Sequence, residues 1–356
     1  MVASGPPTLH DLACVLHLHS TFSDGTGTVP EIVRAARRAG VDVVLLTDHD
    51  TLEARDRGYE GWHEDVLLLV GEEVSPRGGN HYLAFGLEEA IDHDGLTGAE
   101  IVAAVADAGG FGFLAHPFSR GSERFKRAGP GMPWDDLEAP GYTGIELWSF
   151  VTDTVEGLDS VRKIARFVAR PDRVVTGPPE RNLRGWDELT ARRPVVAIGG
   201  VDAHQIGVRM AGRVPLRLMS YRRSFSHLRT HVLLDRPRNG EPAADRDAIY
   251  AALQAGRCYL ALDSLAPAHG FDFGARGPEA VPMGAAADWA EGHVIAARLP
   301  HPAAMTLLRD GEPAELAHGR VLEHRAERPG TYRLEARLDV HGASRTWILS
   351  NPVYLR

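Results

Sequence analysis

The chain has 356 residues, enough for one large domain with a small one or for two medium domains. Apolar residues make up 44% of it and charged residues 24%, a composition typical of a soluble globular protein with a sizeable core. The net charge of -9 argues against a general nucleic-acid-binding surface, because phosphate backbones need clustered Lys and Arg, but it does not exclude a small phosphorylated substrate.

The two cysteines, Cys14 and Cys258, are far apart and stand outside any CxxC pattern. We therefore expect two reduced core cysteines rather than a disulfide framework or a thiolate zinc site. No apolar run is long enough to span a bilayer, and the first residues lack the apolar segment of a signal peptide. These features predict a cytoplasmic protein without membrane contact, and they leave a homo-oligomer open.

Seven short apolar runs recur along the first two thirds of the chain, with helical patterns between them. The runs cover residues 14–19, 42–47, 66–70, 81–86, 111–115, 144–148 and 195–200. Runs of this length are typical of buried strands. Strands that alternate with helices indicate a parallel sheet, either closed or doubly wound.

The clearest helix signal lies at residues 28–40. Thr28 and Glu31 form a capping-box pattern, Pro30 falls in the first turn, and Gly40 follows the last turn. A second capping-box pattern predicts a helix that starts at Thr97 and stops near residue 109. The segments 155–169 and 245–255 are further predicted helices.

The pattern changes after residue 262, where Gly and Pro interrupt the chain repeatedly. The short runs 294–299, 304–309, 330–338 and 347–349 indicate a small all-β module, which we expect to be a sandwich. This places an α/β domain at residues 1–264 and a sandwich at 265–356. Residues 121–141 are polar and rich in Gly and Pro, as in a lid or substrate loop.

Side chains that can bind metals stand at the ends of the apolar runs. His17 and His19 alternate in the first run, and alternate residues of a strand share a face, so both rings are expected to point the same way. The C-terminal ends of the strands in a β/α barrel converge on one mouth, where active sites lie. The expected ligands are His17, His19, Asp24, His49, Glu73, His81, His116, Asp202 and His204.

Imidazoles and carboxylates without thiolates suit Zn, Mn or Fe better than Mg. Nine ligands exceed the capacity of one ion, so we expect two or three divalent ions that share a bridging carboxylate. Such a cluster can activate a water molecule and hold a phosphoryl oxygen.

These residues resemble the motifs of the PHP (polymerase and histidinol phosphatase) family of metal-dependent hydrolases. The resemblance covers roughly residues 12–262 and rests on His17-Leu-His19, Ser23-Asp24-Gly25, Thr47-Asp48-His49, Gly71-Glu-Glu73-Val-Ser75, His81, Ala115-His116-Pro117 and Val201-Asp202-Ala-His204. It implies a distorted (β/α)7 barrel. It also implies that Glu73, rather than Glu72, is the bridging carboxylate.

The resemblance further implies a division of the ligands among three metals. The first would be held by His17, His19, Glu73 and Asp202; the second by Glu73, His81 and His116; and the third by Asp24, His49 and His204. Residues 256–259 and 350–354 resemble a branch of the family that carries an added β-sandwich and includes relatives of carbaryl hydrolases, which cleave a carbamate ester.

Several other residues are candidates with two interpretations each. Asp48, together with Glu73 and His204, is assigned to catalysis, where Asp48 would orient a ligand or assist proton transfer; alternatively, it caps the next helix. Arg120 and Lys126 would hold a phosphate, or they are solvated loop residues. Glu146 would face the substrate, or it forms a buried salt bridge.

The favoured function is a metal-dependent phosphoesterase that cleaves a small nucleotide-like or sugar-phosphate-like ester with a metal-bridging hydroxide. The alternative is an amide, carbamate or carboxylic ester hydrolase with the same metals. Arg and Lys near the metals would favour phosphate, and an apolar pocket would favour the alternative; Trp186 could also stack on a base. The candidate pocket aromatics are Phe118, Trp134, Trp148 and Phe150. A non-enzymatic metal-binding scaffold is a third hypothesis, against which the full ligand set argues.

Overall fold

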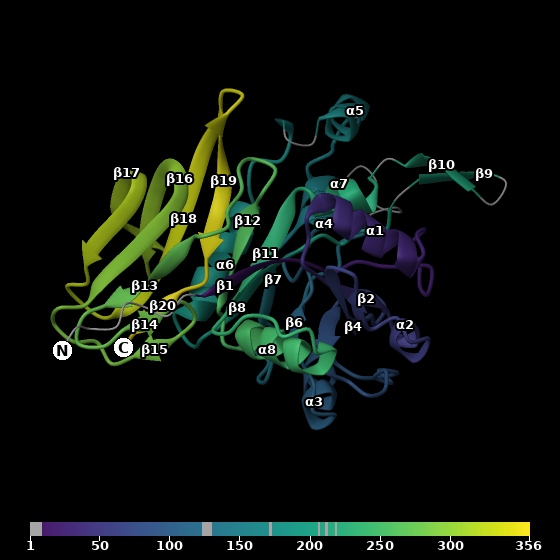
Figure 1. Ribbon diagram of the computed structural model, residues 1–356, viewed down its shortest axis with the longest axis horizontal. Coiled ribbons are helices and arrows are strands. Elements are labelled where there is room, and N and C mark those ends of the chain that lie inside the picture. Colours follow the sequence, from purple (N-terminus) through teal and green to yellow (C-terminus); the bar gives the residue numbers. More distant parts are fainter. Residues whose placement is uncertain (1–8, 123–129, 171–172, 206, 211–212, 218) are drawn as a thin grey trace.

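The computed structural model describes residues 9–122, 130–170, 173–205, 207–210, 213–217 and 219–356. An α/β region extends to Leu262, and every element after it is a strand. In Figure 1 the all-β region, coloured green to yellow, lies on the left, and the α/β region occupies the rest of the view. The prediction of an α/β fold with a C-terminal all-β part is therefore confirmed at this level.

Seven strands of the α/β region correspond to the seven predicted runs. They are β1 (His10–Leu16), β2 (Val43–His49), β4 (Val66–Val74), β5 (Tyr82–Phe85), β6 (Phe111–Leu114), β7 (Gly144–Ser149) and β8 (Val196–Gly200). β1, β2 and β4 pair in parallel, as do β6, β7 and β8. The chain after β8 returns to β1, because Val201 N–H donates to Leu16 O at 2.9 Å and Leu18 bridges Ala203 in parallel.

β5 departs from the expected parallel arrangement, since it is antiparallel to both β4 and β6. The physical reason is the short connection at residues 75–81, which cannot hold the helical crossover that a parallel neighbour requires. In the α/β part of the large sheet, three strands were not anticipated from the sequence. β3 (Gly61–His63) pairs with β4, β11 (Leu228–Leu234) pairs antiparallel with β1, and β12 (Cys258–Leu262) pairs with β11.

The described residues contain the helices predicted at 28–40, 97–109 and 245–255, together with others that were not predicted. In chain order, the helices are α1 (Val29–Ala39), α2 (Glu53–Asp56), α3 (Gly98–Asp107), α4 (Phe150–Glu156), α5 (Val161–Ala169), α6 (Glu180–Thr190), α7 (Tyr221–Phe225) and α8 (Pro242–Gln254). Both predicted capping boxes are present, and Gly40 ends α1 in the left-handed conformation with φ 69°. The single helix expected at 155–169 is instead two, because Ser160 starts a new helix by accepting a hydrogen bond from Lys163 N–H.

The all-β region consists of eight strands. They are β13 (Asp272–Arg276), β14 (Val281–Pro282), β15 (Ala286–Ala287), β16 (Val294–Arg309), β17 (Glu312–Arg325), β18 (Gly330–Val340), β19 (Ala343–Ser350) and β20 (Val353–Leu355). The runs expected at 294–299 and 304–309 are one long strand, β16, whose pairing with β17 shifts register between Arg298 and Ala303. The sequence did not predict β17, because most of its side chains are exposed and the segment therefore lacks the alternation of apolar and polar residues that indicates a strand.

The two regions are joined by strand pairing and buried polar contacts. β12 pairs antiparallel with β19, so one hydrogen-bonded sheet runs through both regions. The Asn351 side chain accepts a hydrogen bond from Ala197 N–H at 2.7 Å and donates one to Cys258 O at 2.8 Å. Within the α/β region, alternate residues of the strands pack into two different clusters, Leu16 in one and Val15 in the other, so both faces of the sheet are buried.

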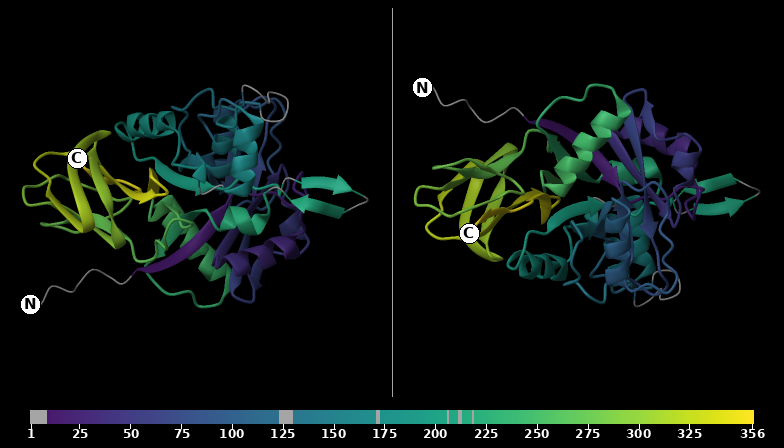
Figure 2. Two further views of the ribbon diagram at one scale, coloured as in Figure 1. Left: turned by 90° about the horizontal axis from the view of Figure 1, so that it is seen from above. Right: turned by 90° about the horizontal axis from the view of Figure 1, so that it is seen from below.

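A hairpin of two short strands lies at the margin of the fold. β9 (Gly207–Met210) and β10 (Arg213–Arg217) pair as an antiparallel hairpin, which projects away from the body of the molecule in both views of Figure 2. Across the described parts of the chain, no helix combines the length and apolar character that crossing a bilayer demands.

Candidate metal centre

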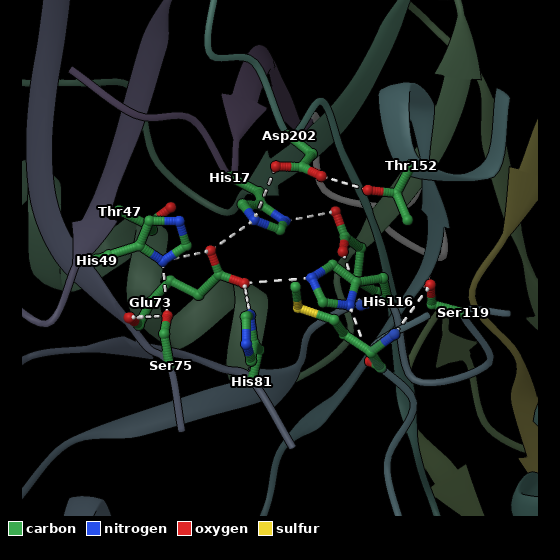
Figure 3. A network of polar contacts seen from close by, with 12 residues as sticks. His17, Thr47, His49, Glu73, Ser75, His81, His116, Ser119, Thr152 and Asp202 are labelled. Atoms are coloured by element: carbon green, nitrogen blue, oxygen red, sulfur yellow. Dashed lines mark hydrogen bonds and ion pairs between the residues drawn. The ribbon is translucent and has the colours of Figure 1, made fainter. Parts of the chain in front are cut away.

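The Glu73 carboxylate lies at the centre of a group of imidazoles near the C-terminal end of β4 (Figure 3). Its Oε2 atom is 3.1 Å from His17 Nε2 and 3.3 Å from both His19 Nε2 and His49 Nδ1. Its Oε1 atom is 2.9 Å from His81 Nδ1 and 3.2 Å from His116 Nε2. Glu73 is only 1% exposed, and its two carboxylate oxygens face separate sets of ring nitrogens, all from buried histidines except that of the partly exposed His49.

The remaining expected ligands lie around the same group. Asp202 Oδ1 is 3.5 Å from His17 Nε2 and 3.5 Å from His204 Nδ1. Asp24 Oδ1 is 3.1 Å from His204 Nε2 and 3.6 Å from His49 Nε2. The His19 ring stacks against those of His49 and His204, with centroids 4.2 and 4.1 Å away. All nine residues therefore converge on one site.

Three of these side chains are aimed by unusual backbone conformations. His17, His116 and Asp202 have φ values of 60°, 32° and 46°, in the left-handed region that non-glycine residues rarely adopt. His17 is the first residue after β1, and His116 and Asp202 are the second residues after β6 and β8. β1 thus ends at Leu16, and the convergence of His17 and His19 comes from this turn rather than from strand alternation. Strain of this kind is typical of sites where function requires a particular side-chain position.

Supporting side chains orient the rings. Glu146, from β7, accepts from His17 Nδ1 at 2.8 Å with Oε1 and from the backbone N–H of His116 at 2.8 Å with Oε2. Thr152 donates to Asp202 Oδ2. Ser75 Oγ is 2.6 Å from His49 Nδ1 and donates to Glu73 O at 2.7 Å. A carboxylate behind a ligating histidine fixes the tautomer and the orientation of the ring.

The centre depends on the absence of a side chain at Gly200, the last residue of β8. A Cβ atom at this position would lie 1.9 Å from Glu146 Oε1 and 2.9 Å from the Cβ of His17. Only glycine leaves room for the carboxylate to reach the imidazole.

The electrostatics of the cluster favour bound positive charge. Burial alone would lower the pKa of His17, but the Glu146, Glu73 and Asp202 carboxylates raise it well above its ordinary value. Burial would raise the pKa of Glu73, yet the neighbouring imidazoles hold it well below its usual range. The pKa of Asp202 is lowered in the same way. This balance of charges suits protons or metal ions in the spaces between these groups.

Glu72 has a different environment from Glu73. Its Oε1 accepts a hydrogen bond from Ile91 N–H at 2.8 Å, on the opposite face of β4. Burial raises the pKa of Glu72 to about 7. The carboxylate within the cluster is therefore that of Glu73.

The other candidate residues are placed as follows. Asp48 accepts hydrogen bonds from Ser20 N–H and Oγ and from Ser23 Oγ, at 2.6 to 2.7 Å, and so holds the loop before Asp24. Arg120 is exposed, and Lys126 lies outside the described residues. Both oxygens of Glu146 are occupied within the cluster, and its side chain is completely buried, which agrees with the alternative of a buried salt bridge.

A cavity of about 550 Å³ opens onto the cluster. Besides ligand side chains, its walls include Met132, Val151, Val155, Thr152 and Glu156. Among the residues that the structure describes, no Arg, Lys, Phe, Tyr or Trp lines it. Arg181 reaches the cavity wall only through Glu156, to which it donates a hydrogen bond, and it also donates to Phe118 O at 3.0 Å.

The aromatic residues expected near the site are core residues. Trp134 and Trp148 are at most 6% exposed, Phe150 is fully buried, and none of them lines the cavity. Phe118 is partly buried and packs against the core. The suggestion that Trp186 stacks on a base is wrong, because its ring is fully buried and its Nε1–H donates to Val195 O at 2.9 Å.

The residues present fit divalent metal ions. Both ring nitrogens of the buried His19 lack a hydrogen-bond partner, which is costly unless a ligand such as a metal engages one of them. Four sets of ligand atoms from the nine residues lie close enough together to hold an ion. They are His17, His19 and Glu73; Glu73, His81 and His116; His17, His116 and Asp202; and His19, Asp24, His49 and His204.

The sequence did not indicate three supporting contacts, which are those of Thr152 with Asp202, of Glu146 with His17 and of Ser75 with His49. Thr152 lies on α4 and reaches Asp202 only through the tertiary fold, so no spacing in the sequence signals it. Ser75 stands in the run Gly71–Ser75 that pointed to Glu73, and its distance of two residues from the carboxylate was the available signal.

Comparison with known proteins agrees with this geometry. Residues 16–150 match the family model of the PHP domain. Over 80 residues the chain is 38% identical to a phosphoribosyl 1,2-cyclic phosphate 1,2-diphosphodiesterase of Eggerthella lenta, covering 21% of this chain and 30% of that protein. Over 61 residues it is 41% identical to a 5'-3' exoribonuclease of Haemophilus influenzae, covering 17% and 22%. The chain thus matches less than a third of the length of either relative.

Among solved structures, a two-domain protein of Bacteroides vulgatus that contains a predicted PHP-like metal-dependent phosphoesterase aligns with 96% of this chain and 95% of its own, at 14% identity and a TM-score of 0.43. The segment matched by the family model contains all the expected ligands except Asp202 and His204. Residues 16–150 of the chain are therefore similar to the PHP domain.

Proposed function

We propose that this protein is a metal-dependent phosphoesterase that hydrolyses a small nucleotide-like or sugar-phosphate-like ester. The observation that carries the proposal is the position of Glu73, whose two carboxylate oxygens face different imidazoles within 3.3 Å. This is the arrangement required of a carboxylate that bridges two ions. One relative is named as a diphosphodiesterase of a phosphoribosyl cyclic phosphate and another as an exoribonuclease, which agrees with phosphate-ester chemistry.

We assign the ligands to three sites. His17, His19, Glu73 and Asp202 would hold the first ion; Glu73, His81 and His116 the second; and Asp24, His49 and His204 the third. The ring of His19 also lies within reach of the third set, so it could serve either the first or the third ion. Nitrogen and carboxylate donors without thiolate suit Zn, Mn or Fe.

When bound, such ions supply Lewis-acid activation of a water molecule and of the phosphoryl oxygens. The chain's own residues provide the frame for that chemistry. Glu146 orients His17, and Thr152 orients Asp202. Asp48 is a positioning residue, because it holds the loop that carries Asp24. His204 lies beside the cavity, where it can contact the substrate as well as a metal.

We also propose that β1, β2, β4, β5, β6, β7 and β8 form the distorted seven-stranded barrel of the family. The support is the hydrogen bonding of the chain after β8 back to β1, which includes His19 N–H to Ala203 O at 3.1 Å. Residues 1–264 would be the barrel domain and 265–356 the sandwich domain.

The alternative reaction at a carbonyl carbon lacks the apolar aromatic pocket expected for it. The described wall of the cavity also lacks Arg and Lys, so the metals themselves would carry most of the attraction for a phosphate. Glu156, Asp24 and Asp202 make the cavity acidic until ions are bound.

The test is a hydrolysis assay on the full chain reconstituted separately with Zn, Mn and Fe(II). The panel contains nucleotides, sugar phosphates, a short oligoribonucleotide and a carbamate ester. We expect release of phosphate from a small ester, and we expect Glu73→Gln to lower the rate on the order of a hundredfold or more. Glu72→Gln is the matched control and should retain the rate. Cleavage of the carbamate ester alone, or of no ester at all, would overturn the proposal.

A further inference from the structure

A second group of histidine and carboxylate side chains lies at the other end of β1 from His17, where the α/β region meets the all-β region. Asp11 stands near the start of β1, and His231 on the neighbouring β11 pairs with the same strand. His269 lies in the loop between β12 and β13. None of these residues belongs to the Glu73 centre.

The geometry of this group is tight. His231 is fully buried, and its Nδ1 lies 2.7 Å from Asp11 Oδ1. Its Nε2 lies 3.3 Å from both carboxylate oxygens of Asp263. The Oδ2 atom of Asp263 also accepts a hydrogen bond from Arg229 Nη1 at 3.0 Å. The ring of His269 meets that of His231 edge-on, with centroids 4.7 Å apart. Ligand atoms of Asp11, His231 and His269 all lie within 4.8 Å of one another.

Asp11 is itself held in place. Its Oδ2 accepts hydrogen bonds from Tyr259 Oη at 2.7 Å and Gly270 N–H at 3.0 Å, which leaves Oδ1 directed at His231. The ring of Tyr259 stacks on that of His231 with a centroid distance of 4.6 Å. Asp11 and His231 are thus fixed by their surroundings, as metal ligands are.

We propose that Asp11, His231 and His269 bind one divalent ion of the zinc class, outside the catalytic cluster. Two imidazoles and one carboxylate are a common zinc donor set, and a water molecule can complete the coordination. Asp263 would hold the Nε2–H of His231, so that Nδ1 offers its lone pair to the ion. Arg229 offsets the charge of that second carboxylate.

The competing arrangement is a proton shared in the gap between His231 Nδ1 and Asp11 Oδ1. Burial alone would lower the pKa of His231, but the Asp11 and Asp263 carboxylates, which accept hydrogen bonds from its ring, raise it to about 9. The presence of His269 beside the pair distinguishes the ion from the shared proton. A proton bridge has no need of a third residue, whereas an ion requires a further ligand near both atoms. The ring of His269 is exposed, which gives an ion a route to the buried pair.

Such an ion would tie β1 and β11 to the loop that leads into the all-β region. It would act on stability rather than on catalysis. The proposal does not depend on the phosphoesterase assignment, because it concerns different residues and a different readout.

The experiment counts zinc per chain by mass spectrometry after exhaustive dialysis of the full-length protein loaded with zinc. The variants are His269→Ala, the more conservative His269→Gln, and His318→Ala, which removes another exposed histidine of the all-β region. We expect both His269 variants to hold one zinc less per chain than wild type, with His318→Ala unchanged. We also expect zinc to raise the unfolding temperature of wild type more than that of His269→Gln, and phosphate-ester hydrolysis to be retained in all three variants. Equal zinc in wild type and both His269 variants would overturn the proposal and assign the pair to a proton bridge.

Discussion

Glu72 and Glu73 are neighbours on β4, and the alternation of a strand sends them to opposite faces. Glu73 enters the imidazole cluster, whereas Glu72 caps the backbone at Ile91. Their chemistry is identical in the sequence, and only their surroundings distinguish the carboxylate proposed to bridge metals from a buried, weakly acidic one. At the residue scale, the function of this site is a matter of which atoms each carboxylate faces.

Glu146 offers a direct test of how the cluster is held. Replacing it by Gln removes the negative charge behind His17 Nδ1 while keeping the shape of the side chain. We expect Glu146→Gln to weaken metal binding by about 10- to 100-fold, because the ring loses the partner that fixes its tautomer. Competition with a chelator measures the affinity, and the rate at saturating metal should recover in part. An unchanged metal affinity would contradict the role assigned to Glu146, and the exposed Glu138→Gln is the control.

Gly200 and Gly199 form a matched pair for a second test. A Cβ at Gly200 would overlap Glu146 Oε1, whereas one at Gly199 would only press on the flexible Leu228 side chain at 3.2 Å. We expect Gly200→Ala to displace the carboxylate and lower both metal content and activity, since neither the backbone nor the buried carboxylate can yield easily. Gly199→Ala should fold with a smaller loss. Equal metal content in the two variants, measured by mass spectrometry, would show that the close approach at Gly200 is not critical.

At the scale of elements, strand ends do the positioning. His17, His116 and Asp202 each leave a strand through a left-handed turn, and α4 supplies Thr152 from the segment after β7. The rigid strands fix where each turn begins, and the turns decide where the side chains point. The site is therefore built on the ends of elements whose interiors are packed.

The start of α4 contains a buried carboxylate that makes stability depend on pH. Asp153 accepts from Ser149 N–H at 2.9 Å, and burial, with a contribution from Glu146, raises its pKa to about 7. Because the folded pKa exceeds that of the unfolded chain, the folded state retains a proton that the unfolded state releases. This stabilising contribution is complete below about pH 4 and is lost as the pH rises to about 7.

We therefore expect Asp153→Asn to gain stability relative to wild type as the pH rises from 5 to 8. The change over this range should be roughly 3 kcal/mol at most, since about two units of the pKa shift lie between pH 5 and the folded pKa of about 7, and each unit corresponds to about 1.4 kcal/mol. Urea unfolding at several pH values measures it. The exposed Asp94→Asn should show a flat difference across the same range, and a flat difference for Asp153→Asn as well would contradict the raised pKa.

At the scale of the whole molecule, the two regions share buried polar contacts as well as a sheet. Arg333 of β18 is only 2% exposed and makes a two-pronged pair with Asp187 of α6, at 2.6 and 2.7 Å. Removing one partner of a buried pair leaves an uncompensated charge, although Glu335 remains at 2.7 Å from Arg333 Nη1.

We expect Asp187→Ala to destabilise the protein by roughly 3 kcal/mol, and the double variant Asp187→Ala with Arg333→Met to recover part of that loss. Thermal unfolding, monitored with and without EDTA, gives the values. The loss should appear in both conditions, because this pair lies away from the metal ligands. A loss seen only in EDTA would contradict an independent role for the contact.

Much of the fold could be predicted from local patterns. The seven apolar runs became strands, and the capping boxes at Thr28 and Thr97 became helix starts, because both signals depend on neighbours within a few residues. The sequence did not predict that β5 is antiparallel to its neighbours. It also did not predict the strands β11 and β12 or the long exposed strand β17. Strand direction depends on how the chain crosses the sheet, and an exposed strand lacks the apolar alternation by which a strand is recognised.

The sequence by itself determined which residue types were available, their order, and their placement after apolar runs, since these follow from chain position alone. Only the tertiary structure decided that Glu146 supports His17 rather than facing the cavity, that Trp186 is a core residue, and that Thr152 orients Asp202. Contacts of this kind join segments far apart in the chain. Their energies depend on burial and on distances of a few ångströms, which become defined only when the strands and helices pack together.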